Sequence, residues 1–246
     1  MKKYIRADLY RLFRRIPRLI MLVIVFAAFF DMFRPSQNPG TTIIELTDLL
    51  ESALKYVPVY IGFIEILYIF GDDFTGKTAQ IAIGTGVKRH QVILAKWLEI
   101  VIAVAIDVII IVVLVLTLSF IKTHTLPAEI VTDVLVHALI SILATASYMA
   151  LIFPVMFFMQ SITVSFLIYI LLASGAVNKI ISYVGNGQLV RWIRIENYTL
   201  TNCLNVFRSR LILGNFQFES VIGIILYLGI SLFLTYIVYK NRELEF

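Results

Sequence analysis

A run of 41 residues without Lys, Arg, Asp, Glu or His, residues 138–178, restricts the fold of this chain more than any other feature. As one helix the run would be about 60 Å long at 1.5 Å per residue, twice a hydrocarbon core of about 30 Å. The run therefore predicts two membrane spans joined by a tight turn. We place the turn in residues 154–161, between Pro154 and Ser161, where Gln160 lies.

Composition extends this conclusion to the whole chain. Hydrophobic residues make up 60% of the 246 residues and charged residues 15%, whereas a soluble domain has about 45–50% and about 25%. We therefore expect an all-α membrane protein that forms a single transmembrane domain, residues 1–246. The predicted spans are six: residues 19–33, 56–70, 97–121, 130–155, 162–184 and 220–239. The single cysteine, Cys203, excludes an internal disulfide.

Residues 1–18 combine an apolar helical face with seven basic side chains. This pattern predicts an amphipathic interfacial helix that lies on anionic lipid. A signal peptide is the alternative, but the basic helix is long and no small-residue cleavage site follows it. The apolar face consists of Ile5, Leu9, Leu12, Phe13 and Ile16, and the basic residues are Lys2, Lys3, Arg6, Arg11, Arg14, Arg15 and Arg18.

The distribution of Lys and Arg predicts the orientation of the chain. With six spans and a cytoplasmic N-terminus, the inside segments carry 13 of these residues and the outside loops carry 8. The positive-inside rule favours this arrangement, with both termini in the cytoplasm. Five of the eight outer charges belong to the last outer loop, residues 185–217, and to Lys179 just before it, and count against it. In that loop an amphipathic helix lines Leu200, Leu204 and Leu211 on one face. Because most of the basic excess is N-terminal, we expect a lipid partner and no nucleic acid.

The polar segment between the second and third spans, residues 71–96, contains a match to the P-loop pattern from Gly71 to Thr78, including Lys77. A P-loop works at a strand-to-helix turn, where backbone N–H groups bind phosphates. The apolar runs on both sides of this match belong to predicted spans, and the remaining sequence offers no alternating strands and helices. We therefore interpret the match as a coincidence.

The same segment is better explained as a cytoplasmic loop. Residues 75–83 form a plausible short helix, Gly84 and Gly86 interrupt it, and a second helix begins near Val87 and continues through Lys96. A short helix held below the membrane between two spans is suited to receive force from a cytoplasmic partner.

The loop resembles that of the permease subunits of type-2 ABC transporters, which has the form Thr, then Gly-[Ile/Val]-x-Arg, then Lys. Here it stands as Thr78, Gly86-Val87-Lys88-Arg89 and Lys96. The resemblance extends to the basic N-terminal helix, the six spans and the amphipathic outer helix. It implies a bacterial cytoplasmic membrane protein that is not itself an enzyme and has no catalytic residue, cofactor or metal of its own. Coupling would involve Asp72, Asp73, Thr78, Ile81, Gly86, Lys88, Arg89 and Lys96, with the Asp pair standing where the family has one acidic residue.

The resemblance also implies the partners: a second copy of the permease or a paralogue, and two cytoplasmic ATP-binding subunits that hold ATP and Mg²⁺. The alternative for Lys88, Arg89 and Lys96 is positive-inside anchoring of the third span. Within this reading we expect export of amphipathic or antimicrobial peptides, with drugs, ions or lipids as alternatives. An ion-coupled transporter lacks support because no inverted repeat is visible. A membrane-embedded enzyme lacks it because no paired catalytic motif is present.

Five ionisable residues lie at or near membrane depth. A carboxylate at a helix centre costs about 2.5–3.5 kcal/mol to insert, so such groups usually face protein or water. Asp107 is nearest the middle of a span, where it either lines a transport path or fixes helix packing. Glu99 follows Lys96 by three residues, a spacing that favours pairing. Asp133 and His137 share a helix face, but two ligands make a weak metal site and we expect none. The set is Glu65, Glu99, Asp107, Asp133 and His137.

Overall fold

The computed structural model describes residues 2–32, 43–75, 78–84, 86–123, 127–185, 198–212 and 218–240, and the regular elements among them are all helices, which confirms the all-α prediction. The elements are α1 (Lys2–Phe13), α2 (Ile16–Met32), α3 (Ile43–Glu65), the π-helical turn η2 (Ile66–Phe70), α4 (Gly71–Thr75), α5 (Thr78–Gly84), α6 (Arg89–Thr123), α7 (Ala128–Met159), α8 (Ile162–Ala173), α9 (Ala176–Gly185), α10 (Leu200–Ile212) and α11 (Phe218–Lys240).

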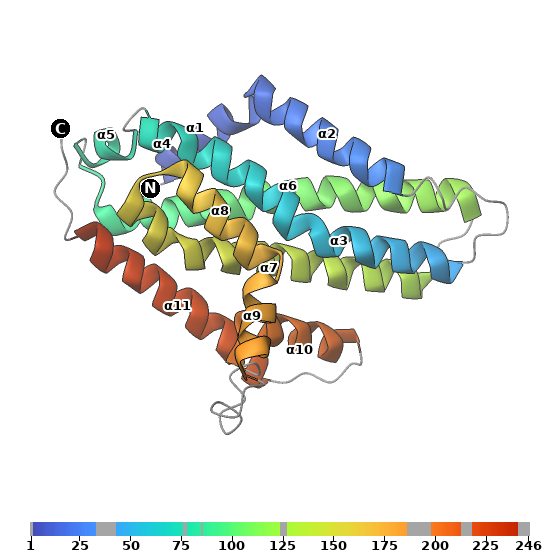
Figure 1. Ribbon diagram of the computed structural model, residues 1–246. Helices are drawn as coiled ribbons and strands as arrows, with labels where there is room; N and C mark the ends of the chain where they lie inside the picture. The colour runs from blue at the N-terminus through green and yellow to red at the C-terminus, as the bar shows by residue number, and fades with distance from the viewer. Residues whose placement is uncertain are drawn as a thin grey trace.

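Helix α7 is the centre of the bundle (Figure 1). It packs against α3, α6, α8, α10 and α11. Its charge-free C-terminal half buries Met149, Ile152, Phe153 and Met156 completely. Small residues at Ala144, Ala146 and Ala150 let neighbouring helices approach closely, as in other membrane bundles. The apolar run that restricts the sequence most therefore forms the core of the fold.

Four helices of the described chain are long and apolar enough to cross a membrane, and α8 with α9 makes a fifth if that pair counts as one span. The apolar part of α2, Ile16–Ala28, is shorter. The structure therefore supports a membrane-spanning protein with four or five such helices by length and composition. The four are Ser52–Phe70, Arg89–Thr117, Val131–Met159 and Phe218–Lys240.

The turn inside the apolar run is shorter than predicted. Helix α7 continues past Pro154 to Met159, so the fourth span is longer than residues 130–155. The reversal is made by Gln160, which has a left-handed φ of 49°, and by Ser161, which is extended. The Gln160 N–H still donates to the Met156 carbonyl at 2.9 Å. A left-handed residue at this position ends a helix without leaving its last carbonyls unpaired.

The position of Pro58 also differs from the prediction. Because α3 begins at Ile43, Pro58 lies in the interior of the helix and not in its first turn. Proline has no N–H, so the carbonyl four residues earlier, that of Leu54, loses its helical donor. The Ser141 hydroxyl of α7 donates to this carbonyl at 2.8 Å. The neighbouring helix thus satisfies the group that the proline leaves without its intrahelical donor.

Two predicted segments are bent. Residues 1–18 form no single interfacial helix, because α1 ends at Phe13 and α2 begins at Ile16. The fifth span, residues 162–184, is broken between α8 and α9, whose axes differ by 61°. Gly175 lies at this break with φ of 74°, a left-handed conformation that costs glycine little.

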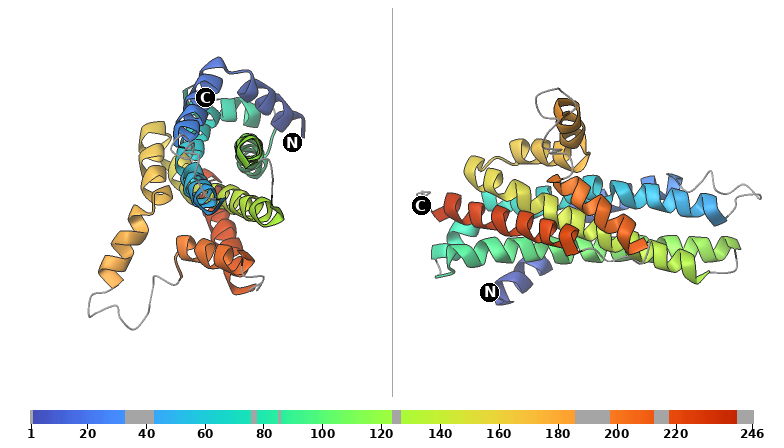
Figure 2. Two further views of the ribbon diagram at one scale, coloured as in Figure 1. Left: turned by 90° about the vertical axis from the view of Figure 1, so that its right-hand side faces the viewer. Right: turned by 90° about the horizontal axis from the view of Figure 1, so that it is seen from below.

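The two ends of the bundle differ in their content. Helices α1, α4 and α5 and the C-terminal end of α11 lie together at one end (Figures 1 and 2). Toward the other end α3, α6 and α7 project beyond α10 (Figure 1). With 35 residues, α6 is about 52 Å long at 1.5 Å per residue.

Candidate functional site: two buried charge clusters beside the α4–α5 segment

Lys96 of α6 is the centre of the first charge cluster, which we call the Lys96 cluster. Its side chain is 1% exposed, and its Nζ lies 2.8 Å from Asp8 Oδ2, 3.0 Å from Asp73 Oδ2 and 3.2 Å from Glu99 Oε2. A buried ammonium group is tolerated only when it is paired, and here three carboxylates pair with it. These carboxylates come from α1, α4 and α6, so one side chain joins three elements. The Lys96–Glu99 pairing matches the i, i+3 spacing noted in the sequence.

Asp73 links this cluster to α5. The Thr78 hydroxyl, in the first residue of α5, donates to Asp73 Oδ1. The structure therefore brings together three residues that the sequence assigned to the loop: Asp73, Thr78 and Lys96. It adds two residues that the sequence analysis missed, Asp8 and Tyr4, whose ring lies 5.6 Å from Lys96 Nζ. Asp8 is the only acidic residue among the first 18, and this was the signal available for it.

The electrostatics of the α1 side chains follow from their contact with Lys96. Burial opposes ionisation of Asp8, but the Lys96 ammonium, through charge and a hydrogen bond, and the Arg11 guanidinium outweigh it. The pKa of Asp8 is therefore below its usual value. Burial raises the pKa of Tyr4 well above its ordinary value, with Lys96 opposing this shift, so Tyr4 stays neutral.

Replacement of Asp8 by Asn should lower the free energy of unfolding by about 1.5–3 kcal/mol at neutral pH, the usual contribution of a hydrogen bond to a charged group. Because the folded-state pKa of Asp8 is below the unfolded value near 3.8, this contribution is complete above about pH 4 and disappears as the pH falls through the folded-state pKa. Thermal unfolding of both proteins from pH 7 to pH 3 in detergent should show the gap closing at acidic pH. A gap that stays constant over this range would contradict the role given to Asp8.

Gly86 ends α5 with a complete hydrogen-bonded cap. Its φ is 96°, its N–H donates to the Ile83 carbonyl at 2.9 Å, and the Val87 N–H donates to the Ala82 carbonyl at 3.1 Å. This pair of bonds is the Schellman motif, which strongly favours glycine at the left-handed position. The chain then turns directly into α6, since the Lys88 carbonyl accepts from Gln91 and Val92. Gly86 therefore fixes the angle between α5 and α6.

Arg89 joins the start of α6 to the end of α11. Its Nη1 donates to the carbonyls of Tyr239 and Lys240, both at 2.7 Å. A cation at a helix C-terminus stabilises the unpaired carbonyls and the negative end of the helix dipole. The guanidinium also lies 5.8 Å from the centre of the Tyr239 ring. Arg89 thus has a structural role that neither coupling nor membrane anchoring had included.

The other predicted loop residues stay outside the Lys96 cluster. Ile81 is 62% exposed on α5, and Lys88 is exposed at the start of α6. Asp72 belongs to α4, but its side chain lies outside the described part of the structure. In the predicted P-loop, Gly71 follows the helical turn η2 where a P-loop has a strand, and Gly76 and Lys77 lie outside the described residues.

A second cluster, the Arg18 cluster, lies deeper in the bundle. Arg18 Nη2 is 2.6 Å from Glu65 Oε1 and 2.8 Å from Asp107 Oδ2, and all three side chains are at most 1% exposed. Arg18 Nε adds a bond to Glu65 Oε1 at 3.1 Å. The sequence predicted the two acids as intramembrane residues but placed Arg18 on the polar face of the N-terminal helix. That placement was wrong, because the break before α2 turns Arg18 toward α3 and α6.

The remaining intramembrane candidates form no site of their own. His137 Nδ1 lies 2.8 Å from the backbone carbonyl of Asp133, one helical turn earlier. Among the described residues no group of three or more potential ligands could hold a metal ion. Neither charge cluster includes either residue.

No protein-family model matches this sequence, and comparison with curated proteins finds no significant match.

Proposed function

We propose that this chain is the membrane-spanning subunit of an ATP-driven exporter, and that α4 and α5 are its coupling element. The observation that carries the proposal is the two-sided character of α5. One side is fixed to the bundle through Thr78, Asp73 and Lys96. The other side exposes Ile81, at the end of the bundle where α1 and the end of α11 also lie.

The connections of α5 explain how force on it would reach the spans. On the N-terminal side, α4 follows η2 and α3 without a loop. On the C-terminal side, Gly86 turns the chain directly into α6. Lys96 ties α1 to the same place, and Arg89 ties α11. A displacement of α5 by a partner would therefore act on four helices together.

The finer features of the proposal follow from the sequence. Helix α2 and the bent pair α8–α9 complete six crossings, and both termini lie on the cytoplasmic side of a bacterial membrane. ATP and Mg²⁺ bind to a separate cytoplasmic subunit, and a second copy of this chain or a paralogue completes the pathway. The cargo is an amphipathic peptide. Exposed apolar side chains on α2 and α8, such as Val23 and Leu167, are available to lipid or to the second permease.

Crosslinking tests the coupling surface. The single cysteine allows a background of Cys203→Ser, in which Ile81→Cys places one thiol on α5. Co-expressed with the ATP-binding subunit encoded beside this chain, the Ile81→Cys protein should form a crosslink to that subunit with a short thiol–amine reagent. Nucleotide should change the yield, because the partner moves when it binds ATP.

The matched control is Thr132→Cys in the same background. Thr132 is exposed near the start of α7, toward the opposite end of the bundle (Figure 1), and should give no crosslink. Equal yields at the two positions, or no copurifying ATP-binding subunit at all, would reject the proposal.

A further inference from the structure

A cavity of about 160 Å³ lies between α3, α7, α10 and the break that joins α8 to α9. It is separate from both charge clusters and is lined by none of their residues. By volume it holds on the order of ten water-sized groups, enough for a phosphate or carboxylate group with its first atoms of substituent. The function proposed above makes no use of it.

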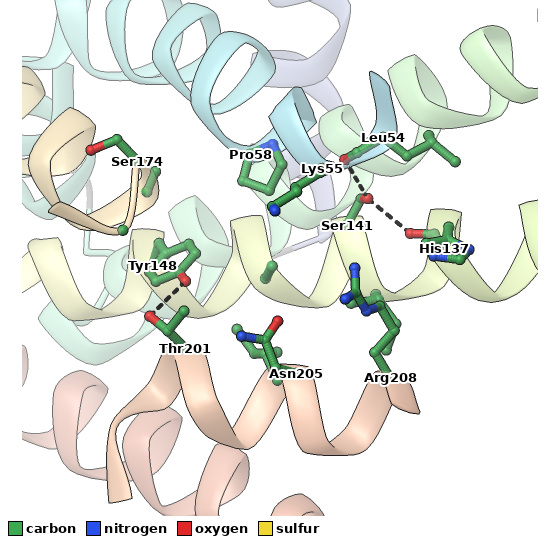
Figure 3. Close-up of a pocket in the computed structure, with 15 residues that line it drawn as sticks. Leu54, Lys55, Pro58, His137, Ser141, Tyr148, Ser174, Thr201, Asn205 and Arg208 are labelled. Atoms are coloured by element: carbon green, nitrogen blue, oxygen red, sulfur yellow. Dashed lines mark hydrogen bonds between the residues drawn. The ribbon is translucent and has the colours of Figure 1, made fainter. Parts of the chain in front are cut away.

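The polar side of the cavity is basic. Figure 3 shows Lys55 of α3 and Asn205 and Arg208 of α10 pointing into the space in front of α7. His137 is a third basic residue in the lining, and no carboxylate side chain occurs among the described residues that line it. An ammonium and a guanidinium around one space repel each other, and the repulsion is strong where water is scarce. An anion between them reverses the sign of this interaction and gains charge-assisted hydrogen bonds.

The other side of the cavity is apolar. Leu54, Ile140 and Leu204 contribute to the lining, and the small residues Ala144 and Ala173 leave the space open. Outward from this wall, α8 exposes Leu167 and Leu171 on the surface of the apolar bundle. A free hydrophilic anion would leave these apolar contacts unused. A molecule with one anionic group and an apolar chain uses both sides.

The walls are held apart by specific bonds. Ser141 Oγ lies 2.8 Å from both the Leu54 and the His137 carbonyl oxygens, which fixes α3 against α7. The Tyr148 and Thr201 hydroxyls are 3.1 Å apart and fix α7 against α10. Both links are drawn in Figure 3. A cavity formed before the ligand arrives reduces the ordering cost of binding.

We propose that this cavity is a binding site for the anionic group of an amphiphile, a phosphate or carboxylate carried on an apolar chain. Arg208 and Lys55 bind the charge, Asn205 donates from its amide, and the Leu54 side of the cavity receives the start of the chain. The proposal does not depend on ATP-driven export or on any partner subunit. The amphiphile is either a lipid of the bilayer or a transported molecule.

Binding of dodecyl phosphate to the purified full-length chain in dodecyl maltoside tests the site. We expect saturable binding that Arg208→Gln weakens at least tenfold and Lys55→Gln at least threefold, with partial recovery in Arg208→Lys. The matched control is Arg210→Gln, the same change two residues along α10, where Arg210 lines a different cavity against α11. It should change affinity by less than twofold.

Two comparisons make the result decisive. Inorganic phosphate should bind at least tenfold more weakly than dodecyl phosphate, because it lacks the apolar chain. Equal affinities for these two probes would overturn the amphiphile proposal, and equal effects of Arg208→Gln and Arg210→Gln would overturn the site. Monodisperse elution of each variant shows that the loss is not caused by unfolding, and Lys55→Gln provides the second variant if Arg208→Gln does not fold.

Discussion

Replacement of Arg18 by Met should destabilise the protein by about 3–5 kcal/mol, because it leaves two buried carboxylates without their cation. Arg18 donates to both Glu65 and Asp107, and the side chains of all three are at most 1% exposed. For a chain of this size the change corresponds to a fall of roughly 6–20 °C in the thermal midpoint. Scanning fluorimetry of the detergent-solubilised protein measures it.

The control for this experiment is Arg14→Met. Arg14 is exposed in the segment between α1 and α2 and stacks on Tyr10 at 4.5 Å. Its replacement should cost less than about 1 kcal/mol, the range of exposed cation–aromatic contacts. A triple variant, Arg18→Met with Glu65→Leu and Asp107→Leu, removes all three charges and should recover most of the loss. Equal midpoints for the Arg18 and Arg14 variants would contradict the buried ion cluster.

Replacement of Lys96 by Met should have a comparable effect on stability and a larger one on coupling. It leaves Asp8, Asp73 and Glu99 close together, and their mutual repulsion separates α1 and α4 from α6. We expect a destabilisation of about 3–5 kcal/mol and loss of most of the ATPase activity that the permease stimulates in its partner subunit. Lys96→Arg, which keeps the charge, should retain more of both.

Lys88→Met is the matched control, because Lys88 lies in the same loop and is exposed. It removes the same charge from the same side of the membrane but breaks no buried pair. If the two variants unfold at the same temperature, the three-carboxylate arrangement around Lys96 is wrong. If Lys96→Met unfolds early but stimulates the partner normally at low temperature, the cluster supports folding alone.

The sequence predicted the elements of this fold better than their extents. The charge-free run predicted α7 and α8 and the turn between them, because the cost of burying charge in lipid acts on every residue of a span. Helix α6 nevertheless begins eight residues before the predicted third span, at Arg89. Apolarity reports the part of a helix that lipid surrounds, whereas α6 also packs against α1 at its polar start.

The long-range contacts of the site were beyond local patterns. Asp73, Thr78 and Lys96 were predicted as one loop, but Asp8 is 88 residues from Lys96 and Arg18 is 89 from Asp107. The two intramembrane acids required a cation, and periodicity within residues 1–18 assigned Arg18 to the polar face. The break between Phe13 and Ile16 changes that face, and a helical pattern drawn across it cannot detect the change. The bend at Gly175 was likewise interpreted as part of a continuous span.

The sequence separation of the Arg18 cluster imposes an order on the synthesis of the protein. Glu65 leaves the ribosome 47 residues after Arg18, and Asp107 leaves it 89 residues after Arg18. At elongation rates of about 5–20 residues per second, the second partner appears about 4–18 s after the arginine. During that interval α2 has an incomplete set of partners, and it reaches its final place only after α3 and α6 have entered the bilayer. The N-terminal helix is thus the first to be made and among the last to be seated.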